Sequence, residues 1–207
     1  KLVDEDVAVS SDWHDLVMDP EINVVVEAIG GIEPARSLIL AAIDAGKHVV
    51  TANKALLAEH GNEIFKAAEE KGVNVALEAA VAGSIPIVKA LREGLAANRV
   101  SSIAGIINGT CNFILSTMRD TGRSFDDVLA EAQRLGYAEA DPTFDIEGID
   151  SAHKLVLLSS IAFGVPVNMD KVHIEGISRL EAKDIKFAEE LGYRVKLLGI
   201  TKYTDYG

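Results

Sequence analysis

The sequence is poor in cysteine and in basic residues, and both shortages narrow the range of functions. Cys111 is the only cysteine among 207 residues, so the chain can form neither an internal disulfide nor a cysteine-based zinc site. Acidic residues outnumber basic residues by 32 to 20, which gives a formal net charge of −12. This charge repels nucleic-acid phosphates and anionic membranes, so we expect no nucleic-acid partner and no membrane partner.

Long apolar runs and an N-terminal signal peptide are missing as well, so we expect a cytoplasmic protein. Apolar residues still make up 48% of the chain, which predicts a globular protein with a core. The chain opens without an initiator Met and closes on a strand-like segment, residues 193–203. We therefore expect it to be part of a longer protein.

The first third of the chain alternates short apolar runs with amphipathic stretches. The runs at 23–31, 47–54 and 74–81 predict strands, and the first is apolar enough to predict a strand buried on both faces. The stretches at 35–46 and 63–72 have helical periodicity and end in glycine. Strands and helices that alternate at this spacing predict right-handed βαβ units and a parallel sheet.

Ligands bind to sheets of this kind beyond the carboxyl ends of the strands, which here are residues 28–31, 51–54 and 78–83. The G-x-G-x-x-G loop that would bind a dinucleotide is absent. Two explanations stay open: either the fold does not bind dinucleotides, or its first βαβ unit lies before Lys1. The chain starts in the middle of the pattern, which favours the second.

The pattern changes near residue 80, where we place a domain boundary. Beyond it we expect strands at 99–108 and 193–203 and helices at 85–95, 109–122, 124–136, 149–164 and near 181–191. Ser124 lies three residues before Asp127, a spacing that predicts a helix N-cap. The predicted fold class is α/β, with a partial Rossmann-like parallel sheet over residues 1–79 followed by an α+β domain over residues 80–207.

The stretch LGYAEADPTFDIEGIDSAHK, residues 135–154, concentrates carboxylates beside a lysine. A calcium loop is excluded, because a loop that started at Asp141 would need glycine where Ile146 stands. A solvated acidic turn and a pocket for a small cationic substrate remain. The apolar and turn residues between the acids favour the pocket.

Asp150 and Lys154 stand at positions i and i+4 of an apolar helix and so lie on one helical face. At a cavity wall, burial would favour the neutral amine of Lys154, while Asp150 would favour its ammonium form. The pair would suit a proton donor, and carboxylates close by would suit a substrate that carries an ammonium group.

Other residues allow two interpretations each. Lys54 follows a strand end and is either a surface lysine or an ammonium that holds a carboxylate, a carbonyl or a cofactor ribose. Cys111 is either core packing or a nucleophile activated at a helix N-terminus. The spacing of the five histidines is not that of metal ligands; they are His14, His48, His60, His153 and His173. We expect His153 to lie on the helix surface or beside the site.

Two long segments, AGIINGTCNFILSTM (104–118) and LGYAEADPTFDIEGIDSAHKLVLLSSIAFG (135–164), resemble the signature of the homoserine dehydrogenase family. VVEAIGG and GKHVVTANKALLAEHG are similar to the second half of that family's cofactor domain, and the similarity runs from about residue 7 to residue 204. The resemblance implies reversible reduction of L-aspartate 4-semialdehyde to L-homoserine by NADH or NADPH, in threonine and methionine synthesis.

The resemblance also implies roles for individual residues. Lys154 matches the proton-donating lysine, and Lys54 matches a second active-site lysine that contacts substrate and cofactor. The family's acidic residues that line the amino-acid pocket correspond to Glu139, Asp145 and Asp150. The family's neighbours of the substrate correspond to Gly109, Thr110 and Tyr137. Cofactor contacts at the strand ends match Ala28, Ile29, Gly30, Thr51, Asn53 and Lys54.

The segment LEAAVAGSIP resembles the family's loop for a monovalent cation, Na⁺ or K⁺. The implied ligands are Glu78 and the carbonyls of Val81, Gly83 and Ile85, and the plain alternative is a tight strand-to-helix turn. The family resemblance further implies that residues 1–79 are part of a dinucleotide-binding domain and that residues 80–207 are the catalytic, substrate-binding domain, which serves partly in dimerisation of a homodimer. The family's glycine-rich loop and later C-terminal segment are absent from these 207 residues.

Two rival functions remain open at this point. One is an aspartate-semialdehyde dehydrogenase-type enzyme that uses Cys111 as a thioester nucleophile. The other is a non-catalytic fragment that binds an amino acid in the acidic pocket.

Overall fold

The computed structural model describes residues 7–204, and the chain divides into two compact units, Lys1–Lys89 and Ala90–Gly207. The outermost residues of the two expected domains, 1–6 and 205–207, lie outside the described residues. Each unit is described by itself.

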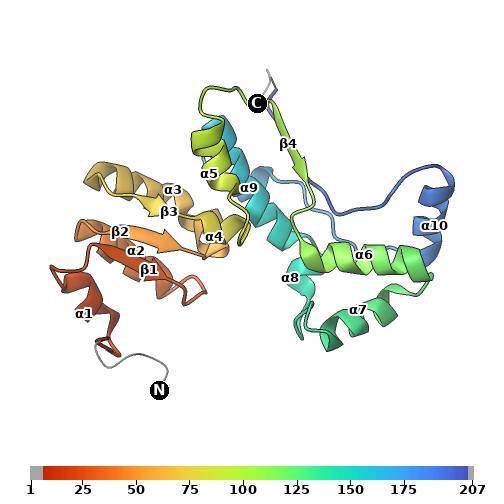
Figure 1. The fold of residues 1–207 in the computed structure, drawn as a ribbon, viewed down its shortest axis with the longest axis horizontal. Helices are drawn as coiled ribbons and strands as arrows, with labels where there is room; N and C mark the ends of the chain where they lie inside the picture. The colour runs from red at the N-terminus through yellow and green to blue at the C-terminus, as the bar shows by residue number, and fades with distance from the viewer. Residues whose placement is uncertain (1–6, 205–207) are drawn as a thin grey trace. The chain divides into compact units, whose positions relative to one another are not determined.

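The first unit is built on a parallel sheet with the strand order β1-β2-β3, as predicted (Figure 1). Its elements in chain order are α1 (Trp13–Met18), β1 (Val24–Glu27), α2 (Ala35–Asp44), β2 (His48–Thr51), α3 (Lys54–Lys71), β3 (Val75–Ala76), α4 (Glu78–Val81) and α5 (Ile87–Lys89). Helices α2 and α3 connect successive strands and pack against each other. The expected fold class, a partial Rossmann-like α/β arrangement, is therefore present.

One face of this sheet is buried and the other is not. Val25 and Val49 lie against the helices, whereas Val24 and Val26 are 49% and 69% exposed. The prediction of a first strand buried on both faces is therefore wrong among the described residues. The physical reason is that α2 and α3 cover only one face, so successive side chains of β1 alternate between core and solvent.

Three local predictions for the first unit differ from the structure. Helix α3 begins at Lys54 and not near residue 63, because Asn53 caps it by accepting the N–H of Leu56. The third strand stops at Ala76, and the following Glu-Ala-Ala-Val forms the short helix α4, since alanine favours helix over strand. Helix α1 was not predicted.

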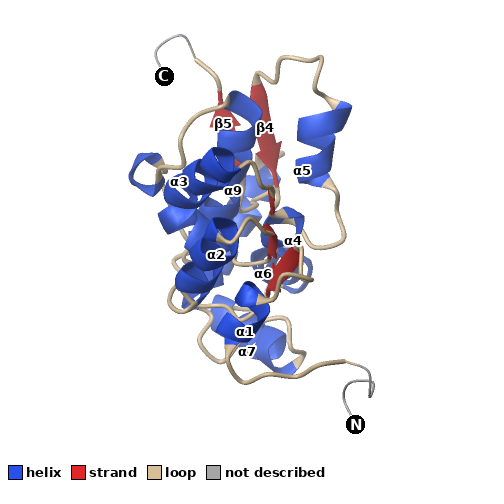
Figure 2. Ribbon diagram, turned by 90° about the vertical axis from the view of Figure 1, so that its left-hand side faces the viewer, coloured by secondary structure: helices blue, strands red, loops and turns tan. Residues whose placement is uncertain are grey.

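The second unit combines a two-stranded antiparallel sheet with five α-helices, and Figure 2 shows β4 and β5 beside α9. Its described elements are η1 (Ala90–Gly94), β4 (Ser102–Gly105), α6 (Gly109–Thr121), α7 (Phe125–Arg134), α8 (Thr143–Ile146), α9 (Ile149–Phe163), η2 (Met169–Lys171), α10 (Ala182–Glu190) and β5 (Gly199–Lys202). The predicted helix at 85–95 is instead α5 followed by the π-helical turn η1, in which the N–H of Leu95 donates to the carbonyl of Ala90.

Helix α6 supplies the centre of the second unit's core. Cys111, Ile114, Leu115 and Met118 recur at helical spacing and are almost completely buried against α7. This packing fixes the orientation of α6, whose N-terminus borders the site described below. The predicted N-cap of α7 is confirmed, because Ser124 accepts the N–H of Asp127.

Among residues 7–204, no helix has the length and apolar content that crossing a membrane would need.

Candidate active site

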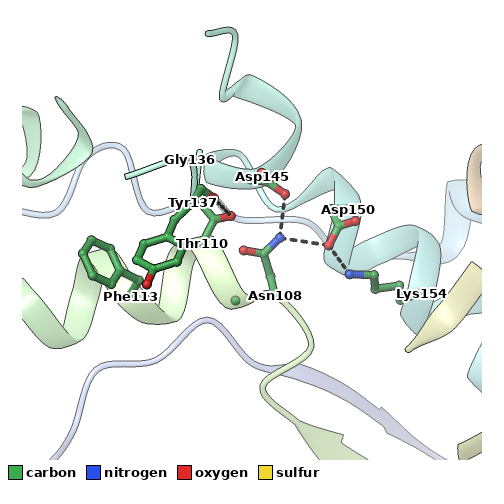
Figure 3. A pocket seen from close by; sticks show the side chains of 9 residues that line it. Asn108, Thr110, Phe113, Gly136, Tyr137, Asp145, Asp150 and Lys154 are labelled. Carbon is green, nitrogen blue, oxygen red and sulfur yellow. Dashed lines mark hydrogen bonds and ion pairs between the residues drawn. The ribbon is translucent and has the colours of Figure 1, made fainter. Parts of the chain in front are cut away.

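A pocket of about 550 Å³ opens in the second unit where the N-termini of α6 and α9 meet α8 (Figure 3). Its volume is in the range of pockets that hold small molecules. The residues that line it are Asn108, Gly109, Thr110, Phe113, Gly136, Tyr137, Asp145, Asp150 and Lys154.

A lysine and a carboxylate form an ion pair at one end of this pocket. The Nζ atom of Lys154 lies 2.7 Å from Oδ2 of Asp150 and 3.0 Å from the carbonyl oxygen of Ile107. The Asp150 side chain is 6% exposed and that of Lys154 is 20% exposed. The predicted placement of both residues on one helical face is confirmed, and the lysine keeps access to the pocket.

Asn108 connects this pair to a second carboxylate. Its Nδ2 amide donates to Oδ1 of Asp145 at 2.7 Å and to Oδ2 of Asp150 at 2.9 Å (Figure 3). Its Oδ1 accepts the N–H of Cys111 at 2.8 Å and so caps α6. Asn108 was not among the predicted site residues, although an asparagine directly before a helix is a typical N-cap and marks this position.

The other end of the pocket is less polar. Thr110 donates its hydroxyl to the carbonyl oxygen of Tyr137 at 2.7 Å, which joins the first turn of α6 to the loop after α7. The rings of Phe113 and Tyr137 lie 4.9 Å apart. Gly109, Thr110 and Tyr137 thus line the pocket, and their contact with a substrate stays a prediction.

The acidic stretch divides between the pocket and solvent. Asp145 and Asp150 face the pocket, while Asp141 is exposed and accepts hydrogen bonds from Thr143, which lower its pKa. Glu139 is exposed and lies outside the residues that line the pocket, so its contact with a substrate stays a prediction.

Cys111 lies in the core below the pocket and is fully buried. Its thiol donates to the carbonyl oxygen of Asp145 at 3.2 Å. Burial, with smaller effects from the charges of Asp145 and Asp150, raises the pKa of the thiol to about 12. A nucleophile needs the opposite shift, so the structure favours the interpretation of Cys111 as core packing.

His153 is buried, with an exposed fraction of 7%, so of its two expected places the helix surface is wrong, and a place beside the site stays a prediction. Its ring lies edge-on to the ring of Phe144, with centroids 5.2 Å apart. His153 lies three positions after Asp150 and one before Lys154, and it faces the interior because Phe144 of α8 covers this side of α9.

A second buried carboxylate organises the carboxyl edge of the parallel sheet in the first unit. Oε1 of Glu27 accepts the N–H groups of Ile29 and Gly30 at 2.9 and 3.1 Å. Its Oε2 accepts the hydroxyl of Thr51 at 2.6 Å. The loop after β1 is therefore tied to the end of β2.

Asn53 completes this connection. Its N–H donates to the Thr51 hydroxyl oxygen at 3.0 Å, and its side chain donates to the carbonyl oxygen of Gly31 at 2.6 Å. The side chains of Thr51 and Asn53 are thus buried within the first unit, and their contact with a cofactor stays a prediction. Ala28, Ile29 and Gly30 are exposed, and Lys54 is the first residue of α3.

The loop after β3 is held by Glu78. Its carboxylate oxygens accept the N–H groups of Val88 and Lys89 at 2.8 and 2.9 Å. The carbonyl of Ile85 accepts the N–H of Ile87 at 2.8 Å. Across the described part of the chain, no group of three or more His, Cys, Asp or Glu side chains could hold a metal ion, so a cation here would depend on backbone carbonyls.

A parallel α/β unit of this kind is typical of nucleotide-binding proteins, and here it is followed by a unit with a lysine–carboxylate pocket, which is the arrangement of a two-domain α/β enzyme. The family follows from sequence comparison. The homoserine dehydrogenase family model matches residues 86–205, and the model of the homoserine dehydrogenase NAD binding domain matches residues 3–78. The chain belongs to the homoserine dehydrogenase family.

Similar proteins extend this match across nearly the whole chain. A homoserine dehydrogenase of Pseudomonas aeruginosa is 64% identical over 96% of this chain and 46% of its own length. The crystal structure of a homoserine dehydrogenase from Thiobacillus denitrificans has a TM-score of 0.93 at 66% identity, over 96% of this chain and 46% of that one. A hyperthermophilic archaeal homoserine dehydrogenase in complex with NADPH has a TM-score of 0.78 at 28% identity, over 95% of this chain and 57% of that one. The chain thus spans about half the length of these bacterial relatives.

The burial of Cys111 predicts an unreactive thiol. With a pKa of about 12, roughly 10⁻⁴ of the thiol is ionised at pH 8, against about a tenth at the ordinary value of 9.0. We expect iodoacetamide at pH 8 to leave Cys111 unmodified in the folded full-length protein and to modify it in denaturant, as followed by mass spectrometry of its peptide. Rapid modification of the folded protein would contradict this account.

The buried hydrogen bond from Thr51 to Glu27 predicts that loss of the Thr51 hydroxyl destabilises the carboxyl edge of the parallel sheet. Thr51→Val keeps the shape of the side chain but leaves the carboxylate of Glu27 and the N–H of Asn53 one partner short. We expect the free energy of unfolding to fall by about 1–3 kcal/mol in urea titrations of the full-length protein. The control is Thr201→Val on β5, where valine suits the strand, and a loss no larger than the control's would contradict the role of the hydroxyl.

Proposed function

We propose that the full-length protein interconverts L-homoserine and L-aspartate 4-semialdehyde with NAD or NADP. The observation that carries the proposal is the ion pair of Lys154 and Asp150 at the wall of a pocket, in a chain of the homoserine dehydrogenase family. Both ligands of the reaction carry an ammonium group, and the pocket presents two carboxylates to it.

Lys154 exchanges a proton with the substrate oxygen that is bonded to the carbon at which hydride transfer occurs. The cofactor, when bound, supplies or accepts the hydride. During reduction the aldehyde oxygen gains negative charge, and Lys154 donates a proton from Nζ to form the alcohol. During oxidation the hydroxyl proton passes to Nζ of Lys154 in its neutral amine form, which becomes the ammonium group again. Asp150 and the carbonyl of Ile107 hold Nζ in place, so the amine does not have to be oriented anew in each cycle.

The carboxylates bind the amino acid. Asp145 reaches the pocket from α8 and is the acceptor we assign to the substrate ammonium, while Asp150 is engaged by Lys154. Glu139 is assigned to the amino-acid site from the family resemblance alone. Gly109, Thr110 and Tyr137 shape the wall beside the substrate, and Lys54 is the second lysine, which contacts substrate and cofactor.

The carboxyl edge of the parallel sheet fits a dinucleotide. Gly30 and Gly31 have φ angles of +74° and +72°, and a Cβ built on either would meet nothing within 4 Å. A ligand can therefore lie directly against this backbone, which glycine permits and most residues would not. Ala28, Ile29 and Gly30 would support the cofactor, with Thr51 and Asn53 holding their loop.

A monovalent cation, Na⁺ or K⁺, fits the loop after β3 only in part. The carbonyls of Val81, Gly83 and Ile85 are the hard oxygen donors that such an ion accepts. The carboxylate of Glu78 is instead engaged by the N–H groups of Val88 and Lys89, so it would shape the loop. The backbone of this loop has a specific conformation, because Ser84 has a φ of 65°, an uncommon value for a residue other than glycine.

The wider biology of the proposal follows from the family resemblance. We place the reaction in threonine and methionine synthesis, in the cytoplasm, with a homodimer as the working form. The alternative of an enzyme that uses Cys111 is disfavoured by the burial of that thiol and by its raised pKa.

Removal of the Lys154 amine tests the proposal. In the full-length protein with L-homoserine and NAD or NADP, we expect Lys154→Ala to lower kcat by about 10²- to 10⁴-fold, because the hydroxyl loses its proton acceptor. Absorbance of the reduced nicotinamide measures the rate.

The matched control is Lys171→Ala, which removes an exposed lysine of η2 and should keep the rate of the unchanged protein. No turnover by the unchanged full-length protein would refute the proposed reaction. Full turnover by Lys154→Ala would refute the role of Lys154 alone. Binding of homoserine without turnover would support the non-catalytic alternative.

A further inference from the structure

The side-chain amide of Asn108 lies between the carboxylates of Asp145 and Asp150 and donates a hydrogen bond to each. The side chain is buried, with an exposed fraction of 4%, and its amide nitrogen has two hydrogens. One goes to Asp145 on α8 and the other to Asp150 on α9. Asn108 thereby connects the start of α6 to α8 and α9, and the two aspartates lie 37 and 42 positions after it in the sequence.

The chemistry of these groups fixes their roles. An amide nitrogen only donates, so the oxygens of Asp145 and Asp150 that it contacts act as acceptors. Two carboxylates that approach the same point repel each other, and a donor placed between them offsets this repulsion. Asp150 is also bonded to Lys154, so its position determines where the lysine Nζ lies.

We propose that Asn108 is a positioning residue for the amino-acid substrate, which aims Asp145 at the substrate ammonium and Asp150 at Lys154. This inference rests on the proposed function. Asn108 would touch neither hydride donor nor reacting carbon, and it would act through the two carboxylates that it holds.

A purely structural role as the N-cap of α6 is the competing explanation. Asparagine, aspartate and serine cap helices about equally well. Asn108→Ser therefore retains a cap while it removes both bonds to the carboxylates. Asn108→Asp retains the cap and the shape but sets a third carboxylate against Asp145 and Asp150. A role as cap predicts little effect on substrate kinetics, whereas a positioning role predicts a large one.

Steady-state kinetics of the full-length protein separate the two roles. We expect both variants to raise KM for L-homoserine by about 10- to 100-fold, because hydrogen bonds that orient charged groups are lost. KM for the nicotinamide cofactor should stay within about twofold, because the proposed cofactor site is the carboxyl edge of the parallel sheet, which Glu27 and Thr51 stabilise, whereas Asn108 belongs to the second unit. Asn168→Ser is the matched control: it changes an exposed N-cap, on η2, and should leave both KM values as they are.

Thermal unfolding with and without homoserine or cofactor, each at about ten times the KM of the unchanged protein, supplies a second readout. In Asn108→Ser, the stabilisation by homoserine should fall to about a third or less of that in the unchanged protein, while the stabilisation by cofactor persists. An unchanged homoserine KM in both variants would overturn the proposal, and so would loss of folded protein in both, because Asn108 would then serve the fold alone. If the unchanged protein did not oxidise homoserine, the proposed function would fail, while selective loss of homoserine binding in Asn108→Ser would still support the positioning role.

Discussion

Burial of the Asp150 carboxylate is the constraint on which the candidate site depends. A carboxylate removed from water is costly unless charged or polar donors replace its hydration. The structure supplies two such donors, the amine of Lys154 and the amide of Asn108. Since these groups come from α9 and from the N-cap of α6, the carboxylate can be satisfied only when both helices are in place. The packing of α6 on α7 and the geometry of the pocket are therefore linked.

The same principle recurs at the edge of the parallel sheet. Glu27 is buried at the end of β1, and its oxygens accept two backbone N–H groups and the hydroxyl of Thr51. Because Ile29 and Gly30 direct their N–H groups to Glu27, these groups serve the shape of the loop and not an anion. In each unit, one buried carboxylate sets the form of the surface on which a ligand would lie.

Much of the fold follows from sequence periodicity, and part of the site does too. The apolar runs of β1 and β2, the i, i+4 pair of Asp150 and Lys154, and the cap at Ser124 are local patterns, and each is present. The bonds from Asn108 cross about 40 positions of sequence, so no local pattern contains them. Burial of His153 and exposure of Val26 also depend on which faces other elements cover. Tertiary packing decides those properties, and periodicity cannot.

The most direct test of the account is a crystal structure of the full-length protein with L-homoserine bound. The account predicts that the substrate hydroxyl oxygen lies within hydrogen-bonding distance of Nζ of Lys154 and that the ammonium group contacts the carboxylate of Asp145. Homoserine bound in the reverse orientation, with its ammonium group at Lys154, or bound outside the pocket, would contradict the account.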